Sequence, residues 1–249
     1  MESNPNPPIS LSPNLPIPAT YSEALPDCPP PEDNLEALIR IDGKDARIGF
    51  AASYHTAGIA CAPRSCWVRA GVFALLQRAA GLLPDGYSLL IFDAYRPLAV
   101  QQALYDAAAA EVRRLHPAYT PAQVASAVDN FVALPKHDPM RPAPHATGGA
   151  VDLTLCLHGT PADMGTAFDD FSPDARTAAW EAKPPTPRNM TIRDHRRLLY
   201  HTMLAAGFVN YSEEWWHYSC GDRLWARTLG KTPFYGLACA PGPDPAGGN

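Results

Sequence analysis

The sequence has no excess of positive charge, since its 249 residues carry 20 lysines and arginines against 25 aspartates and glutamates, a formal net charge of -5 at pH 7. A basic field that would attract nucleic acid or an anionic lipid surface is therefore missing. The chain also lacks an apolar run near the roughly 20 residues that a membrane-spanning helix needs. We therefore expect neither nucleic acid nor a membrane as a partner, and the sequence leaves the oligomeric state open.

Signals of export and of a disulfide framework are equally scarce. The N-terminus has no basic segment followed by an apolar one, which a secretory signal would show, and the six cysteines include no Cys-x-x-Cys pair. Their spacing is unlike that of a small secreted disulfide-rich domain. We expect reduced thiols in a cytoplasmic protein, with a disulfide between Cys61 and Cys66 as the open alternative.

Proline crowds both ends of the chain and divides it into three parts. Residues 1–32 have too few periodic apolar positions to bury a face, so we expect an extended or disordered segment. Residues 239–249, rich in proline and glycine, are expected to form a flexible tail. Residues 33–238 are enough for one domain with a sizeable core.

Apolar periodicity predicts both helices and strands in this domain. The predicted helices are Trp67–Ala80 ended by Gly81, Ala99–Leu115, a short helix capped by Thr120 before Pro121, and a helix capped at Thr191 that runs to Ala206 before Gly207. The predicted strands are Tyr87–Phe92, Gly149–Leu157 and Glu213–Cys220. Because they do not alternate as regular βαβ units, the order favours an α+β fold with a largely antiparallel central sheet flanked by helices.

Two strand-associated clusters contain side chains that could bind a metal. His145 precedes the strand Gly149–Leu157, on which strict alternation turns Asp152 away from the leucines. Glu214 and His217 lie in the aromatic strand Glu213–Cys220. Imidazole and carboxylate donors suit zinc, and a catalytic zinc takes three protein ligands and leaves one position for water. Taken singly, a histidine in a glycine-rich turn or a carboxylate at a strand edge is more often a hydrogen-bonded structural residue.

The exact residue order in three segments is a more specific signal than the spacing of the candidate metal ligands. The sequence reads Phe-Asp-Ala-Tyr-Arg-Pro at 92–97, Ala-Pro-His-Ala-Thr-Gly-Gly-Ala-Val-Asp at 143–152 and Glu-Trp-Trp-His at 214–217. In this order they resemble the D-alanyl-D-alanine dipeptidases, zinc peptidases that include the enzymes of vancomycin resistance. Further similarity at Met164-Gly165 and Phe168-Asp169 extends the resemblance over most of residues 45–236.

The resemblance implies a role for six side chains. It makes His145, Asp152 and His217 the ligands of one zinc ion per chain. It also makes Glu214 the catalytic base, Arg96 the residue that stabilises the transition state, and Asp169 a carboxylate near the free amine of the substrate. The implied substrate is a small D-dipeptide, D-alanyl-D-alanine. The implied fold, shared with related D,D-peptidases, is an antiparallel sheet flanked by helices, in agreement with the strand pattern.

Two positions depart from the family pattern. The family serine two places before the first histidine is Ala143 here, so a hydroxyl contact with the substrate is lost or comes from Thr147 or elsewhere. A position that is often tyrosine corresponds loosely to Phe50. Neither change touches a predicted zinc ligand.

The predicted base raises a geometric difficulty. In an ideal strand, Glu214 and His217 are three residues apart and so point to opposite faces. We therefore expect Glu214 at the strand entrance or in a bulge, where the chain can re-aim a side chain. Glu213 satisfies the alternation better, but the family segment favours Glu214.

Other interpretations of these residues stay open. Arg96 could form only an ion pair with Asp93, and Asp169 could cap a helix. At the level of function, the alternatives are a D,D-carboxypeptidase that acts on longer cell-wall peptides and an inactive zinc-stabilised binding domain. A purely structural zinc site would have no need of Glu214 or Arg96 and usually closes with a fourth ligand.

Overall fold

The structure is a computed structural model that describes residues 15–19, 25–129, 132, 137–170 and 172–239. Its α-helices are α1 (Ser53–Thr56), α2 (Ala70–Leu82), α3 (Leu98–Leu115), α4 (Pro121–Val128), α5 (Pro187–Ala206) and α6 (Arg223–Leu229). Its strands are β1 (Leu38–Ile41), β2 (Ile48–Phe50), β3 (Cys66–Arg69), β4 (Tyr87–Asp93), β5 (Ala150–Leu157), β6 (Thr160–Pro161), β7 (Val209–Asn210) and β8 (His217–Ser219). Two short 3-10 helices are η2 (Pro144–Thr147) and η3 (Pro173–Ala175).

The central sheet has the strand order β2-β4-β5-β8-β7, and β6 pairs with β5 beside this path. Among its pairings only β2–β4 is parallel. The pairs β4–β5, β5–β6, β5–β8 and β7–β8 are all antiparallel. Strands β1 and β3 form a separate antiparallel pair. The predicted α+β fold with a largely antiparallel sheet is therefore confirmed.

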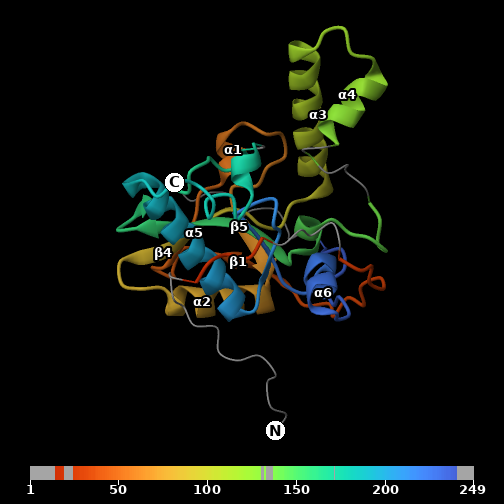
Figure 1. The fold of residues 1–249 in the computed structure, drawn as a ribbon. Coiled ribbons are helices and arrows are strands. Elements are labelled where there is room, and N and C mark those ends of the chain that lie inside the picture. Colours follow the sequence, from red (N-terminus) through yellow and green to blue (C-terminus); the bar gives the residue numbers. More distant parts are fainter. Residues whose placement is uncertain (1–14, 20–24, 130–131, 133–136, 171, 240–249) are drawn as a thin grey trace, which may run out of the picture.

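The main core lies between this sheet and two helices that cover it, α2 and α5 (Figure 1). One buried cluster contains Leu153 and Leu155 of β5, Leu76 of α2, and Leu199 and Met203 of α5. The leucine face of β5 is thus the core face, as alternation predicted. The opposite face of β5 is left for polar side chains.

Helices α3 and α4 form a hairpin that projects away from the sheet (Figure 1). It has a small apolar cluster of its own, centred on Ala109, Val124 and Val128. Thr120 caps α4 and Pro121 takes the first helical position, as expected from the sequence; Gln123 completes a capping box with Thr120. The predicted helix Ala99–Leu115 is α3, one residue longer at its start.

The predicted helix Trp67–Ala80 has a wrong start and a slightly wrong end. Residues 66–69, expected to be partly helical, form β3, because Cys66, Trp67 and Val68 pair with β1 and their bulky or β-branched side chains suit a strand. Helix α2 then passes through Gly81 and ends at Leu82, because Pro84 disfavours a helical conformation at the preceding residue.

Helix α5 begins earlier than predicted. Its N-cap is Thr186, whose hydroxyl accepts a hydrogen bond from the Asn189 amide, and Pro187 takes the first helical position. Thr191 lies inside the helix, where its hydroxyl donates to the carbonyl of Pro187. The predicted end is correct, because Gly207 closes the helix at a φ of 116°.

The described part of the N-terminal segment contains no helix or strand in residues 15–19 and 25–32, yet it packs on the domain. Ile17 is buried, and its amide donates to Glu181. Arg223 and Arg227 of α6 donate to backbone carbonyls of residues 25–29. This stretch therefore lacks regular secondary structure but is attached to the domain, while residues 240–249 of the predicted tail lie outside the described residues. No helix in the described ranges is both long and apolar enough to cross a membrane.

Candidate active site

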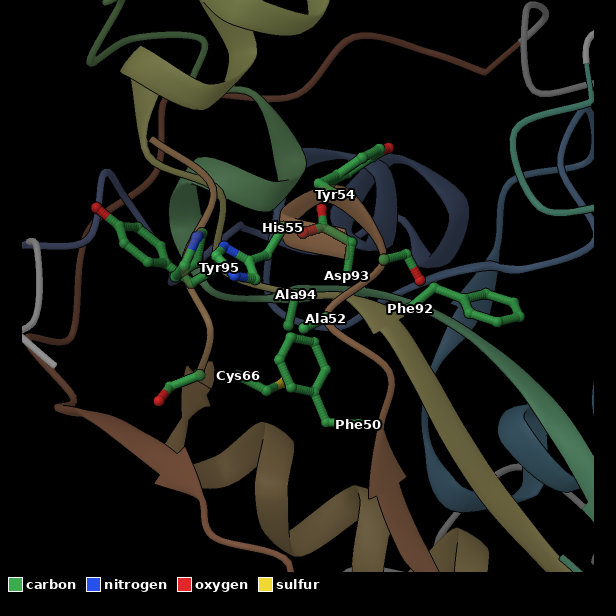
Figure 2. A pocket seen from close by; sticks show the side chains of 12 residues that line it. Phe50, Ala52, Tyr54, His55, Cys66, Phe92, Asp93, Ala94 and Tyr95 are labelled. Atoms are coloured by element: carbon green, nitrogen blue, oxygen red, sulfur yellow. The ribbon is translucent and has the colours of Figure 1, made fainter. Parts of the chain in front are cut away.

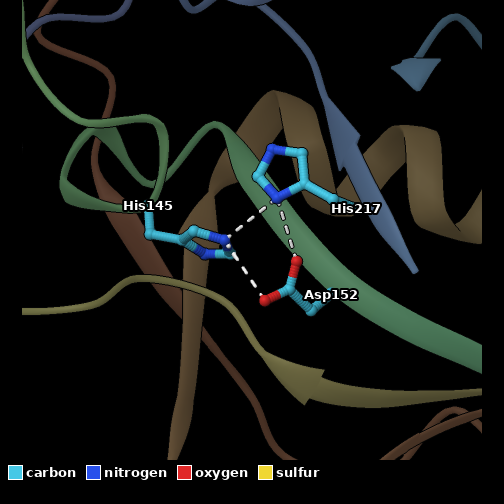
Figure 3. A group of neighbouring side chains, drawn as sticks. All are labelled: His145, Asp152 and His217. Carbon is cyan, nitrogen blue, oxygen red and sulfur yellow. Dashed lines mark hydrogen bonds and ion pairs between the residues drawn. The ribbon is translucent and has the colours of Figure 1, made fainter. Parts of the chain in front are cut away.

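Three buried side chains converge on one point, as Figure 3 shows. His217 Nδ1 lies 3.0 Å from Asp152 Oδ1 and 3.2 Å from His145 Nε2, and His145 Nε2 lies 3.3 Å from Asp152 Oδ2. One potential ligand atom from each residue falls within 4.8 Å of the other two. Two imidazole nitrogens and a carboxylate oxygen are a donor set that zinc prefers.

Strand register brings two of these donors together. Asp152 of β5 pairs directly with His217 of β8, and Asp93 of β4 pairs with Asp152 on the other side. Directly opposed residues on neighbouring strands share a face and have close side chains. The register of β4 and β5 shifts between Ile91 and Asp93, so Phe92 is an extra residue that places Asp93 in this polar row.

The third donor comes from the turn before β5. His145 belongs to η2, which ends at Gly148 with a φ of 71°. Glycine suits this positive φ, and a Cβ at Gly148 would lie 2.4 Å from Leu38 Cδ2, so the leucine side chain would have to move. The His145 Nδ1 donates to the Ala94 carbonyl at 2.8 Å, which leaves Nε2 free to face the other two donors.

The charges of this group compensate one another. Burial acts to raise the pKa of Asp152, but the charges and hydrogen bonds of His145 and His217 outweigh it, so the pKa lies far below its usual range. Burial acts to lower the pKa of His217, but the hydrogen bond and charge of Asp152 raise it above the ordinary value. A buried carboxylate between two imidazoles is thus held ionised, the form in which it can bind a metal.

Glu214 lies beside the three donors, in a turn. The predicted strand Glu213–Cys220 is shorter than expected, because its ladder begins only at His217. The His217 amide donates to the Glu214 carbonyl at 3.2 Å, a turn that removes the strict alternation between the two residues. Glu214 Oε2 therefore reaches to 3.9 Å from His217 Nδ1 on the same side of the chain.

The electrostatic setting of Glu214 differs from that of Glu213. Burial raises the pKa of Glu214, against the lowering effect of His217. Its side chain is nevertheless 31% exposed, so it can reach a ligand in the pocket. Glu213 points elsewhere and forms an ion pair of 2.8 Å with Arg176. The geometry thus brings Glu214, rather than Glu213, to the predicted site.

Arg96 follows β4 and is held on three sides. Its Nε donates to Asp93 at 2.8 Å, its Nη1 to Gln101 at 2.8 Å, and its Nη2 to the Tyr54 hydroxyl at 3.2 Å. Nη2 also lies 3.5 Å from Asp152 Oδ2. The ion pair with Asp93 considered from the sequence is present, and it orients the guanidinium toward the three donors.

Asp169 lies in a turn, in the left-handed region at a φ of 59°. It caps no helix, because the N-cap of the nearby η3 is Ser172. Burial and the charge of Asp152 raise the pKa of Asp169 to about 7, despite the opposite effects of Arg96 and a hydrogen bond with Tyr54. A non-glycine residue at positive φ that carries a poorly compensated carboxylate is typical of a functional position.

A single pocket of about 730 Å³ is lined by all six predicted site residues. Tyr54, Gln101, Tyr211 and His137 also line it and were not predicted from the sequence. Ala143 lines the pocket too, but Thr147 does not, because its buried hydroxyl donates to Pro144 and accepts from the Gly149 amide. Thr147 is therefore no substitute for the family serine.

Behind this pocket lies a much smaller one of about 10 Å³, drawn in Figure 2. Its lining includes Phe50, Cys66 and Asp93, and it shares Tyr54 and Tyr95 with the large pocket. It has room for about one water molecule. Phe50 therefore lies outside the large pocket. Cys66 is buried and free, and Cys61 is free as well, so the alternative of a disulfide between them is not realised.

Three metal donors and an adjacent glutamate that is not one of them, all open to one large pocket, meet the requirements of metal-dependent hydrolysis. Fold and site together define a metal-dependent hydrolase. Comparison with known proteins narrows this class: the sequence model of the D-Ala-D-Ala dipeptidase family matches residues 62–233. The chain therefore belongs to this family of zinc peptidases, and its donor set fits zinc.

Individual relatives agree with this assignment. A D-alanyl-D-alanine dipeptidase from Synechocystis sp. is 35% identical over 175 residues, which are 64% of this chain and 71% of that protein. The Enterococcus faecium enzyme of the same name is 33% identical over 60% of this chain and 70% of its own length. The Escherichia coli D-alanyl-D-alanine dipeptidase is 34% identical. This match covers 54% of this chain and 55% of the E. coli protein.

A solved structure gives a more distant likeness. It is a crystal structure of a mutant of the vancomycin resistance D,D-pentapeptidase VanY, from a VanB-type resistance cassette, in complex with Zn(II). The match has 21% sequence identity and a TM-score of 0.40, and it covers 68% of this chain and 83% of that one.

Proposed function

We propose that the protein hydrolyses the dipeptide D-alanyl-D-alanine to two D-alanines, with one zinc ion held by His145, Asp152 and His217. The observation that carries this proposal is the arrangement of the pocket. Three metal donors lie beside Glu214 and Arg96, and a half-buried carboxylate, Asp169, lines the same pocket. The names of the relatives support the same substrate.

Bound zinc would supply a Lewis acid and lower the pKa of a coordinated water to about 7. Glu214 takes the proton from the attacking water and passes it to the leaving amine, which suits a carboxylate whose pKa burial raises. Arg96, already oriented by Asp93 and Gln101, stabilises the negative oxygen that develops on the peptide carbonyl. The free ammonium of the dipeptide pairs with Asp169.

Asp169 also accounts for a limit on substrate length. An acetylated or longer peptide has no ammonium to place opposite this half-buried carboxylate, and a partly desolvated charge without a partner is costly. We therefore assign the chain to free dipeptides rather than to longer cell-wall peptides. Its six cysteines are all free, which suits the reducing cytoplasm in which we place the enzyme.

The test is hydrolysis of D-Ala-D-Ala, its N-acetylated form, L-Ala-L-Ala and an N-acetylated tripeptide that ends in D-Ala-D-Ala. Zinc content is measured on the same sample. We expect about one zinc per chain, and release of D-alanine from the free D-dipeptide at least 100-fold faster than from either acetylated peptide. A chelator should abolish the activity, and added zinc should restore it.

Two outcomes would contradict the proposal. Comparable rates on free and acetylated substrates would point to the D,D-carboxypeptidase alternative. Zinc-loaded protein that cleaves none of the peptides would instead point to an inactive zinc-stabilised domain.

A further inference from the structure

The two histidines of the metal group offer different ring nitrogens. His145 presents Nε2, and His217 presents Nδ1, which lies 3.0 Å from Asp152 Oδ1. To bind a metal through Nδ1, His217 must carry its ring proton on Nε2. Some acceptor therefore has to hold that proton, as the Ala94 carbonyl does for His145.

The group that faces His217 Nε2 is a side chain of the same strand. Ser219 Oγ lies 3.2 Å from this nitrogen. Ser219 is fully buried, and it lies two residues after His217, so both side chains leave β8 on the same face. A serine hydroxyl accepts from Nε2–H when its own proton points away from the ring, and in this buried position that proton needs another acceptor.

That acceptor is offered by Asp222, which is buried at the start of α6. Its Oδ1 accepts the amide of Trp225 at 2.9 Å and so caps the helix. Its Oδ2 is buried and makes no hydrogen bond within the described ranges of the chain, so it is an acceptor that lacks a donor. Burial raises the pKa of Asp222, against the lowering effects of the Trp225 amide and of the nearby Ser219 hydroxyl.

We propose that Asp222 and Ser219 are positioning residues that, through the Ser219 hydroxyl, hold His217 in the tautomer that binds the metal through Nδ1. Ser219 accepts from His217 Nε2–H and donates to Asp222. This inference rests on the proposed role of His217 as a ligand. It assigns Asp222 two functions, one for each oxygen: helix capping by Oδ1 and orientation of the histidine by Oδ2.

The substitution Asp222→Asn separates these two functions. Asparagine is as good an N-cap as aspartate, so α6 should stay capped. Its amide group replaces the acceptor with a donor, so the Ser219 proton turns toward His217 Nε2 and favours the wrong tautomer. We expect zinc affinity, measured by competition with a chelator of known affinity, to fall about 10- to 100-fold.

Ser219→Ala should weaken zinc binding to a similar extent, and Ser219→Thr, which keeps the hydroxyl, should restore most of the affinity. The double variant Ser219→Ala with Asp222→Asn should bind zinc no more weakly than Ser219→Ala alone, because Asp222 acts through the serine. The control is Thr186→Ala, which removes the cap of α5 away from the pocket. It should lower the melting temperature without changing zinc affinity.

Unchanged zinc affinity in folded Ser219→Ala and Asp222→Asn would overturn the inference, and so would fully additive losses in the double variant. These results are distinguishable from failure of the proposed function. If the wild-type protein binds no zinc, the proposed function itself fails. If the wild type binds zinc and the variants bind it equally well, only the positioning role fails.

Discussion

The two ends of the pocket are built differently. At the metal end, Asp152 and His217 come from paired strands. The ring nitrogens that face away from the donor group make hydrogen bonds with the Ala94 carbonyl and the Ser219 hydroxyl. At the other end, Asp169 lies in a turn at positive φ. The first end is fixed by the sheet, whereas the second depends on a locally strained loop.

The difference extends to charge. The carboxylate of Asp152 has two imidazoles and Arg96 within reach, and its pKa lies far below the ordinary value. The pKa of Asp169 is raised to about 7 by burial and by the negative charge of Asp152. The metal end is therefore already arranged for a cation, while the Asp169 end lacks a full countercharge until a cationic group arrives. For this reason we assign the substrate ammonium to Asp169.

The largest effect is expected at the metal end, from Glu214→Gln. Loss of the proton acceptor should reduce kcat by about 10³-fold or more, while zinc content stays at the wild-type value because no donor is removed. The matched control is Glu213→Gln, which breaks only the ion pair with Arg176 and should leave turnover nearly unchanged. If Glu213→Gln were the inactive variant, the assignment of the base would be wrong.

A smaller loss is expected between the two ends, from Arg96→Lys. Lysine keeps the charge but lacks the planar fork that engages Asp93, Gln101 and Tyr54 together, so kcat should fall about 100-fold with a smaller change in KM. Steady-state kinetics on D-Ala-D-Ala would measure both constants. Arg176→Lys, on the surface, is the control. A change confined to KM would make Arg96 a substrate-binding residue instead.

The smallest effect concerns stability at the Asp169 end, measured by urea unfolding of the metal-free protein. Because the folded pKa of Asp169 is raised to about 7, its ionisation destabilises the fold progressively as pH rises from about 4 to about 7. Asp169→Asn removes this cost, so the variant should match the wild type at pH 4. Above pH 7 it should exceed the wild type by about 1–3 kcal/mol, less than the full shift implies because the side chain is partly exposed.

The control for this measurement is the neighbouring Asp170. Its pKa is lowered by hydrogen bonds with Ser172, so the same substitution, Asp170→Asn, should bring no gain in stability at high pH. An equal gain in both variants would show that net charge, rather than the buried setting of Asp169, is responsible.

The sequence by itself determined the features that depend on local chemistry. Helix α3, the capped start of α4, and strands β4 and β5 follow from periodicity and capping residues, and the structure has them close to the predicted bounds. The wording of the segments at 92–97, 143–152 and 214–217, together with Phe168-Asp169, likewise identified the six residues that line one pocket. Such signals are local, so they can be read from a single stretch of chain.

Tertiary structure decided what depends on distant partners. Residues 66–69 become a strand because β1 pairs with them, and Glu214 shares a side with His217 because the chain turns before β8. Tyr54 lies 42 residues before Arg96 and reaches it with no local motif to mark the contact. Pairing and close approach between remote segments are set by packing of the whole domain, which local propensity does not contain.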